Sequence, residues 1–403
     1  MVNAGNTAAK SCGRFFVLAL AALFLNAAKA AGQPADSSRL DARFAVTLSE
    51  SCLISSLRLP DLYRIASINA APCRSEAVVL AREKAELYVG TTEGALFKLS
   101  LPSLSVRQKI QLEGRVVRIF VPQTAPYLIA EVALQDMSSE LMVMDIATWS
   151  VLRRLTLQDR QGNRQVLLHM IESPSRKSLL LSFEKVSELW ELFMGADAPA
   201  VFEGLVHDYR LGEGIREPEL LPVRRIRLDA PIVEFVAEPD SPHLLIRHGD
   251  RLGRTKVSRF NLDVRRAVSA RQIEVPPDLS PATHFGTGTL RIGSHALQIS
   301  EQIALAGESC RASTRIGIGR VALWSCTGED AGRLFVVDLA AGKLTAILEP
   351  DAGNSIQDVA ADRESMFLLA IANRDKLLLY RTGNWCRLDV LAATHVSKVW
   401  AYP

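Results

Sequence analysis

This chain of 403 residues has little net charge and, after residue 30, no apolar stretch long enough to span a membrane. Lys and Arg together number 47 against 44 Asp and Glu, a formal net charge of +3. A balance this close to neutral gives no electrostatic reason to bind nucleic acid, which requires a basic surface. We therefore expect a globular protein with no nucleic-acid partner and no stable membrane anchor.

The sequence also lacks the short motifs of common enzyme classes. It contains no Gly-x-Ser-x-Gly elbow, no phosphate-binding Walker loop and no His-Glu-x-x-His zinc motif. It has no Cys-x-x-Cys-His, the motif that attaches a c-type haem, and no Cys and His spacing typical of a zinc site. These absences disfavour an ordinary hydrolase and exclude a covalent haem c.

Cysteine is scarce, with six residues in the whole chain. Cys310 and Cys326 are close enough in sequence to bridge two neighbouring strands, and Cys52 with Cys73 could do the same. This pairing leaves Cys386 without a partner. We expect the cysteines to be structural.

Residues 1–30 have the pattern of a secretory signal peptide. A basic start precedes an uncharged apolar run from Phe15 to Leu25, and Ala28-Lys29-Ala30 matches a small-x-small cleavage site. We expect cleavage after this site and export to the periplasm, where the oxidising environment permits disulfides.

A repeat of about forty residues organises the rest of the chain. The segment from Leu57 to Leu62 recurs from Leu99 to Leu104, and weaker forms return around Ile146, Leu262, Leu339 and Arg381. This period is typical of the four-stranded blade of a β-propeller, as in WD40-like and YVTN-like repeats.

Within each repeat the apolar runs are short and rich in β-branched residues. Three consecutive strands are predicted in one repeat, at residues 77–80, 86–89 and 95–99. Residues 178–183 and 367–371 have the continuous apolar pattern of a buried central strand. Few segments have a helical period, so the predicted class is all-β.

We predict a single β-propeller over residues 31–403, with eight blades, or seven as the alternative count. The segment from His395 to Tyr402 predicts a C-terminal strand that closes the ring by completing the first blade, which begins near Arg43. The alternative fold is two packed β-sandwiches. It would require a linker midway, for which the insertion from Gly195 to Pro222 is the candidate.

Two segments that combine histidine with glycine or a cation interrupt the strand pattern. Val206 to Gly214 contains His207 and Arg210, and Thr283 to Gly288 contains His284. Imidazole can ligate iron or carry a proton, and guanidinium binds carboxylates bidentately. Glycine lets the backbone approach a flat ligand closely. These segments predict a site for a planar anionic ligand.

Most other histidines are expected to be ordinary hydrogen-bonded residues, namely His169, His243, His248 and His395. His207 also has a purely structural interpretation, in which Asp208 and Arg210 form an ion pair that holds a long loop against the propeller.

The two segments resemble the haem d1 propeller family, which comprises the haem d1 domain of cytochrome cd1-type nitrite reductases and the related dihydro-haem d1 dehydrogenase. Glu188 to Leu192 followed by Gly204 to Arg210 is similar to a family segment with a His at the start of a blade. Thr283 to Gly288 is similar to the family's Pro-His-x-Gly-x-Gly element, whose His lies at the haem d1 pocket. The blade from Ile232 to Ile273 has the same spacing.

The resemblance implies a periplasmic propeller that binds haem d1 or a related tetrapyrrole during its assembly, transfer or redox use. It implies that His284 contacts the iron or the active site, that Gly286 and Gly288 shape its loop, and that His207 and Arg210 handle protons and bind carboxylates. If the chain is an enzyme, it is an oxidoreductase acting on or through the tetrapyrrole, with His284 and His207 as its catalytic residues. A periplasmic c-type cytochrome or another protein is the candidate partner.

The chain departs from the family pattern in three ways. It has no haem c motif, Ser75 stands where the dehydrogenase has a His, and His295 is the sole counterpart of a second active-site His. The alternative function is a non-catalytic propeller scaffold for protein–protein interaction. Arg and His side chains converging on the axis would favour the tetrapyrrole, whereas an apolar channel would favour the scaffold.

Overall fold

The computed structural model describes residues 43–203 except 71, 82 and 83, and thereafter residues 215–216, 220–237, 241–249, 255–268, 273–275, 289–292, 295–298, 310–315, 320–326, 333–338, 343–348, 355–362, 366–393 and 395–402. Regular structure in these residues is almost entirely β, with short 3-10 turns such as Pro174–Arg176. No helix among them is long and apolar enough to cross a membrane.

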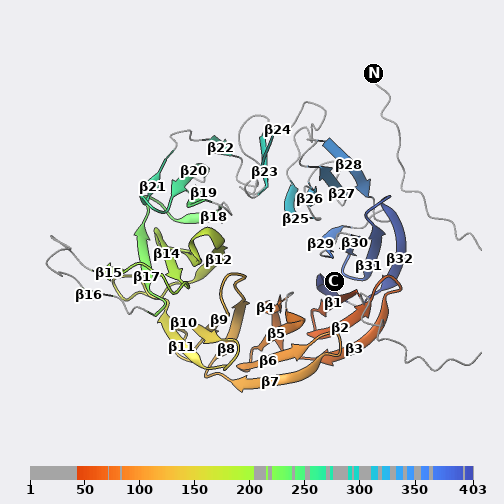
Figure 1. Ribbon diagram of the computed structural model, residues 1–403, viewed down its shortest axis with the longest axis horizontal. Helices are drawn as coiled ribbons and strands as arrows, with labels where there is room; N and C mark the ends of the chain where they lie inside the picture. Colours follow the sequence, from red (N-terminus) through yellow and green to blue (C-terminus); the bar gives the residue numbers. More distant parts are fainter. Residues whose placement is uncertain are drawn as a thin grey trace, which may run out of the picture.

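Antiparallel sheets follow one another around a common centre (Figure 1). The first blade contains β1 (Phe44–Ser49), β2 (Leu53–Arg58), β3 (Tyr63–Asn69) and the C-terminal β33 (Val396–Tyr402). The second contains β4 (Cys73–Ala81), β5 (Glu86–Thr91), β6 (Ala95–Ser100) and β7 (Ser105–Gln111). The third contains β8 (Arg115–Phe120), β9 (Tyr127–Ala133), β10 (Ser139–Asp145) and β11 (Val151–Thr156). The fourth contains β12 (Leu167–Ser173), β13 (Ser178–Phe183), β14 (Glu188–Phe193) and β17 (Val223–Arg227).

The rest of the ring is built in the same way. The fifth blade contains β18 (Ile232–Ala237), β19 (His243–Gly249), β20 (Thr255–Asn261), β21 (Arg266–Ala267) and β22 (Ile273–Val275). A later blade contains β25 (Cys310–Arg315), β26 (Arg320–Cys326), β27 (Leu334–Asp338) and β28 (Lys343–Leu348). The last blade contains β29 (Ile356–Ala361), β30 (Phe367–Ala372), β31 (Lys376–Arg381) and β32 (Cys386–Ala392). Two hairpins complete the set: β15 (Phe202–Glu203) with β16 (Ile215–Arg216), and β23 (Thr289–Ile292) with β24 (His295–Gln298).

This arrangement confirms the predicted all-β propeller and differs from two packed sandwiches. The predicted C-terminal strand is β33, which pairs antiparallel with β1 from Phe44 opposite Tyr402 to Ser49 opposite Val396. The predicted strands of the second blade are β4, β5 and β6, and the two predicted central strands are β13 and β30, both buried throughout. The number of blades remains a prediction.

The repeated segment of the sequence is a repeated turn of the structure. The bonds Leu59–Pro60 and Leu101–Pro102 are both cis, and Leu62 and Leu104 both have positive φ, at 51° and 54°. Each turn joins the third strand of a blade to its outermost strand. The echo in the sequence therefore marks equivalent positions of successive blades.

The apolar core lies between blades, because each sheet packs one face against its neighbour. Tyr88, Val116 and Met142 belong to one buried cluster contributed by the second and third blades. Gly90 of β5 is required at this contact, since a Cβ there would lie 2.3 Å from Cγ1 of Val116.

The cysteines confirm one prediction and correct another. Cys52 and Cys73 form a disulfide. It joins the β1–β2 turn to the start of β4, so it links two blades and not two neighbouring strands of one sheet. Cys310 and Cys326 lie opposite each other in β25 and β26, and a bond between them remains a prediction. Cys386 is disulfide-bonded, so the prediction that it is left unpaired is wrong; spacing in the sequence does not show which cysteines meet in the folded chain.

Candidate functional site

Five of the innermost strands share one irregularity. β8, β12, β18, β29 and β33 each shift register by one residue near their start, at residues 117, 168, 233, 357 and 397. A bulge of this kind re-aims the following side chain, and bulges are frequent beside functional sites. The residue after the bulge is ionisable in every case: Arg118, His169, Glu234, Asp358 and Lys398. We call these five residues the inner ring.

All of these strands begin on the same face of the propeller, because the blades are four-stranded meanders joined from an outermost strand to the next innermost one. We call this the start face. Because the bulges lie near the strand starts, the inner ring lies near the start face. Figure 1 shows the sheets arranged around a common centre.

Two members of the inner ring join neighbouring blades by the same kind of contact. Arg118 of the third blade donates from Nη1 to the carbonyl oxygen of Leu168 on β12, at 2.8 Å. Nε2 of His169 lies 2.8 Å from the carbonyl oxygen of Val233 on β18. Since a carbonyl only accepts, Nε2 of His169 carries the proton. In each case the acceptor is the bulge residue of the next innermost strand.

Asp358 makes the corresponding contact with the opposite polarity. Its Oδ2 accepts from the backbone N–H of Val399 on β33, at 2.9 Å. Burial raises the pKa of Asp358, and the hydrogen bonds from the backbone of Val399 and Val359 and the charge of Lys398 oppose this rise. The hydrogen bond between the last and first blades is therefore accepted by the Asp358 carboxyl, whose burial makes ionisation unfavourable.

A buried carboxylate supports Arg118 from its own blade. Glu131 of β9 is 5% exposed and lies opposite Arg118 in the register, with 3.5 Å between Oε2 and Nε. Burial raises the pKa of Glu131, and the charges of Arg118 and Arg74 oppose the rise. Arg74 thus acts on this pair from the neighbouring β4.

Exposed charges lie where the innermost strands begin. Arg74 and Glu76 on β4 and Arg115 on β8 are all exposed. Arg115 also lines a cavity of about 750 Å³ between the second and third blades, together with Glu113, Gly114 and Met137. The start face therefore has a hollow whose inner edge carries a cation.

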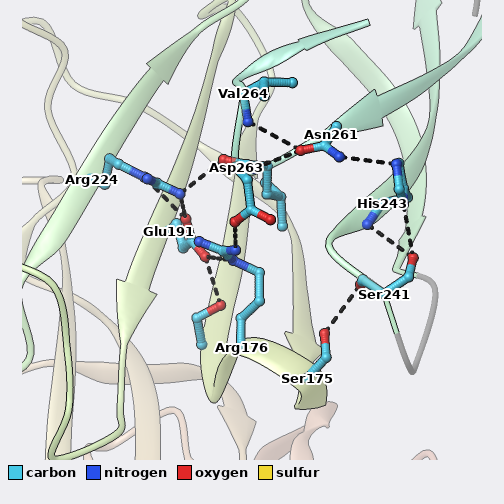
Figure 2. Close-up of polar contacts among 11 residues, drawn as sticks. Ser175, Arg176, Glu191, Arg224, Ser241, His243, Asn261, Asp263 and Val264 are labelled. Carbon is cyan, nitrogen blue, oxygen red and sulfur yellow. Dashed lines mark hydrogen bonds and ion pairs between the residues drawn. The ribbon is translucent and has the colours of Figure 1, made fainter. Parts of the chain in front are cut away.

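A second polar cluster lies on the opposite face, between the fourth and fifth blades (Figure 2). Glu191 of β14 is fully buried and accepts from Arg176 Nε at 2.6 Å and from Ser178 Oγ at 3.0 Å. Arg224 of β17 binds its other oxygen, and Arg176 also binds Asp263, which follows β20.

The charged groups of this second cluster are paired with one another. Burial lowers the pKa of Arg176, but the hydrogen bonds and charges of Glu191 and Asp263 outweigh it and leave that pKa raised. Both arginines lie over Phe193, at 6.0 and 5.3 Å from its ring centroid. The cavity beside it, of about 210 Å³, is lined by Arg176, Lys177 and Asp197. We interpret the cluster as a joint that fixes the base of the 195–222 insertion.

The site residues predicted from the sequence lie outside the described residues. His207 and Arg210 fall between β15 and β16, a hairpin that stands at the periphery of the ring (Figure 1). His284, Gly286 and Gly288 fall between β22 and β23. Their roles therefore remain predictions. Among the residues that are described, no group of three or more His, Cys, Asp or Glu could hold a metal.

The four histidines expected to be structural behave as expected where a contact is given. His243 is bonded to Ser241 and Asn261 within the fifth blade, and His248 Nδ1 lies 3.3 Å from the carbonyl oxygen of Ala230. Burial lowers the pKa of His248. His395 is exposed just before the start of β33, and its Nδ1 lies 4.0 Å from Oε2 of Glu50.

The inner ring itself was missed by sequence reasoning, although a signal for it exists. An apolar residue, any residue, an ionisable residue and an apolar residue follow one another at residues 116–119, 167–170, 232–235, 356–359 and 396–399. A single ionisable residue within an apolar strand looks like an ordinary exposed position. It stands out only when the five strand segments are aligned with one another.

No family model matches the chain, and no curated protein matches it. Among solved structures, the chain is similar to the dihydro-heme d1 dehydrogenase NirN in complex with DHE. The TM-score is 0.65 with 17% sequence identity, over 90% of this chain and 75% of that one. The chain therefore has a β-propeller fold like that of this dehydrogenase.

The resemblance noted in the sequence is therefore confirmed at the level of the fold. The chain also aligns with the β-propeller domain of Cps50 (Swd1) from Myceliophteria thermophila, at a TM-score of 0.42 and 12% identity over 79% of this chain and 87% of that one. We build nothing on a likeness that weak. A haem d1-type propeller fold by itself does not assign a ligand, because propellers host many functions.

Proposed function

We propose that this chain binds a haem d1-like tetrapyrrole at the centre of its start face. The observation that carries the proposal is the inner ring: every shifted innermost strand carries an ionisable residue near its start, in a fold shared with a dihydro-heme d1 dehydrogenase solved in complex with DHE. An apolar-lined centre would have favoured the alternative, a scaffold for other proteins.

The described residues fit the carboxylates of such a ligand. Arg74 and Arg115 are exposed cations at the starts of two adjacent innermost strands. Guanidinium groups pair with carboxylates through two parallel hydrogen bonds, which fixes the orientation of a flat ligand. Arg118 is less suited to this role, because its guanidinium already binds the backbone of β12.

The candidates for an iron ligand come from the sequence. Among the described histidines, His169 and His243 use ring nitrogens in hydrogen bonds, and His395 is exposed beside Glu50. His284, with His207 and His295 as alternatives, is our candidate for the iron or for proton handling. When bound, the tetrapyrrole would supply iron and a conjugated ring able to exchange electrons.

The test is an optical titration of the purified chain from Ala31 onward with haem d1, its dihydro precursor and haem b. We expect saturable, stoichiometric binding of a d1-type ligand, a changed spectrum in His284→Ala, and weaker binding in Arg74→Met. The matched control is Arg64→Met, which removes an exposed arginine from the outermost strand of the first blade and should bind as the parent does. No binding by a correctly folded parent would overturn the proposal in favour of the scaffold.

We also propose that the chain is exported to the periplasm. Besides the signal-like residues 1–30, the Cys52–Cys73 disulfide supports this, because such bonds persist in oxidising compartments. Cell fractionation with mass measurement of the purified product tests it. A product that retains residues 1–30 in the cytoplasm would contradict the proposal.

A further inference from the structure

Lys398 is the described member of the inner ring that does not join two blades. Its position after the bulge of β33 is equivalent to that of Arg118 and His169, and the next innermost strand is β4 of the second blade. Arg118 and His169 each bind the backbone of the next innermost strand. Within the described residues, the side chain of Lys398 makes neither a hydrogen bond nor an ion pair, and its ammonium lies 5.2 Å from the centroid of the Trp400 ring.

The first and second blades, which a hydrogen bond from Lys398 could have joined, are joined instead by a disulfide. The disulfide between Cys52 and Cys73 links the first blade to the start of β4, and it lies on the start face. β4 is also the innermost strand with the widest irregularity, since its register breaks between Cys73 and Val78. A covalent link therefore replaces the hydrogen-bonded latch at this junction, and the ammonium of Lys398 is left available.

The surroundings of Lys398 make the lack of a hydrogen-bond acceptor for its ammonium unfavourable. The side chain is half-buried, and burial lowers its pKa, while the charges of Asp358 and Glu76 oppose the decrease. A half-buried ammonium without a hydrogen-bond acceptor loses part of its hydration, and a contact with an aromatic ring replaces only part of that loss. A ligand oxygen reaching this point would restore that interaction.

The two carboxyl groups also restrict the chemistry of such a ligand. Asp358 on β29 and Glu76 on β4 are the groups whose negative charge acts on Lys398 from the flanking blades. A carboxylate beside Lys398 would be repelled by the charge of Glu76 and would make Asp358 harder still to ionise, whereas an uncharged carbonyl oxygen accepts the hydrogen bond without that repulsion.

We propose that Lys398 is a ligand-binding residue that donates a hydrogen bond to an uncharged oxygen on the edge of the tetrapyrrole, while Arg74 and Arg115 bind its carboxylates. This rests on the proposed function and assigns a part of the site that the sequence did not indicate. The disulfide maintains the junction between the first and second blades, so Lys398 contributes to binding and not to the stability of the ring.

The first test compares Lys398→Met with Arg118→Met and with Lys98→Met, a lysine paired with Glu86 at 2.8 Å within the second blade. We expect Lys398→Met to bind the tetrapyrrole roughly tenfold more weakly, the loss of one such hydrogen bond, with an unchanged urea midpoint. Arg118→Met should lower the midpoint, and Lys98→Met should bind normally. Normal binding by Lys398→Met, or a midpoint as low as that of Arg118→Met, would overturn the inference.

The second test identifies the ligand group through a tetrapyrrole whose carboxylates are esterified. Esterification should abolish the difference in affinity between the parent and Arg74→Met, because the ester and the substitution each remove the same contact between guanidinium and carboxylate. The tenfold difference between the parent and Lys398→Met should persist with the ester, because that contact does not involve a carboxylate. Loss of this difference would show instead that Lys398 binds a carboxylate.

A third readout separates this inference from the proposed function. An amine-acylating reagent applied to the full chain should modify Lys398 in the absence of ligand, and bound tetrapyrrole should protect it without changing the labelling of Lys98. If the parent binds no tetrapyrrole, the proposed function fails. If the parent binds but Lys398 is labelled equally with and without ligand, the proposed function stands and the role of Lys398 fails.

Discussion

Nε2 of His169 lies 2.8 Å from the carbonyl oxygen of Val233, across the boundary between the fourth and fifth blades. The same side chain packs edge-on against Phe235, with 6.0 Å between ring centroids. A residue that reads in the sequence as one polar interruption of an apolar strand is therefore a joint between two sheets.

Replacing this joint should weaken the ring locally. We expect His169→Leu to lower the free energy of unfolding by about 1 kcal/mol, because the carbonyl of Val233 loses its donor. Urea unfolding followed by fluorescence measures it. His395→Asn is the control, since His395 is exposed and has a φ of 50°, which asparagine tolerates. Equal stability of His169→Leu and the parent would contradict the role of the joint.

The buried Glu191 cluster makes a second prediction. Glu191→Leu should cost about 3–5 kcal/mol of unfolding free energy, because Arg176 and Arg224 are left without their shared carboxylate. Replacing all three residues, as Arg176→Met, Glu191→Leu and Arg224→Met together, should recover most of that loss. A triple variant less stable than Glu191→Leu would mean that the charges contribute net stability and not only geometry.

Close packing between the second and third blades makes a third prediction. Gly90→Ala should destabilise the fold by about 1–3 kcal/mol, because the new Cβ would lie 2.3 Å from Val116 Cγ1. Adding Val116→Ala should return part of the loss. Gly383→Ala is the matched control, since nothing lies within 4 Å of a Cβ at that position. Equal thermal unfolding midpoints for Gly90→Ala and Gly383→Ala would contradict the importance of this contact.

The raised pKa of Asp358 makes a pH-dependent prediction. A carboxyl whose pKa is higher in the folded chain binds more protons there than in the unfolded chain, so its contribution is fully present below the unfolded pKa and is lost as the pH rises through the folded pKa. Asp358→Asn does not titrate. We therefore expect its stability relative to the parent to increase as the pH is raised from about 4 to about 7.

Urea midpoints of both proteins across this pH range measure the effect, and Asp375→Asn, which lies in the turn between β30 and β31, serves as control. A relative stability that decreases with rising pH would imply that the hydrogen bond from Val399 and the charge of Lys398 outweigh the burial of Asp358.

The fold followed from local patterns in the sequence. Strands such as β5 and β30 are continuous apolar runs with the length of buried strands, and the echo of Leu57 to Leu62 at Leu99 to Leu104 marks one turn used twice. The strand from Val396 to Tyr402 could be predicted as the partner of β1 because a propeller without it would leave an open edge.

The candidate site depended on information that no local window contains. The disulfide between Cys52 and Cys73 could be paired by spacing, but its place between two blades depends on how the β1–β2 turn meets the start of β4. Glu191, Arg176 and Asp263 come from three separate stretches, and each alone resembles a solvated charge.

By itself, the sequence determined the class of strands, their repeat and the pairing of the two ends of the chain, because apolar periodicity and turn chemistry act over a few residues. Only the tertiary structure decided which charged residues face one another. One extra residue near the start of five innermost strands precedes Arg118, His169, Glu234, Asp358 and Lys398. Arg118, His169 and Asp358 bind the backbone of the next innermost strand, whereas the junction beside Lys398 is closed by a disulfide.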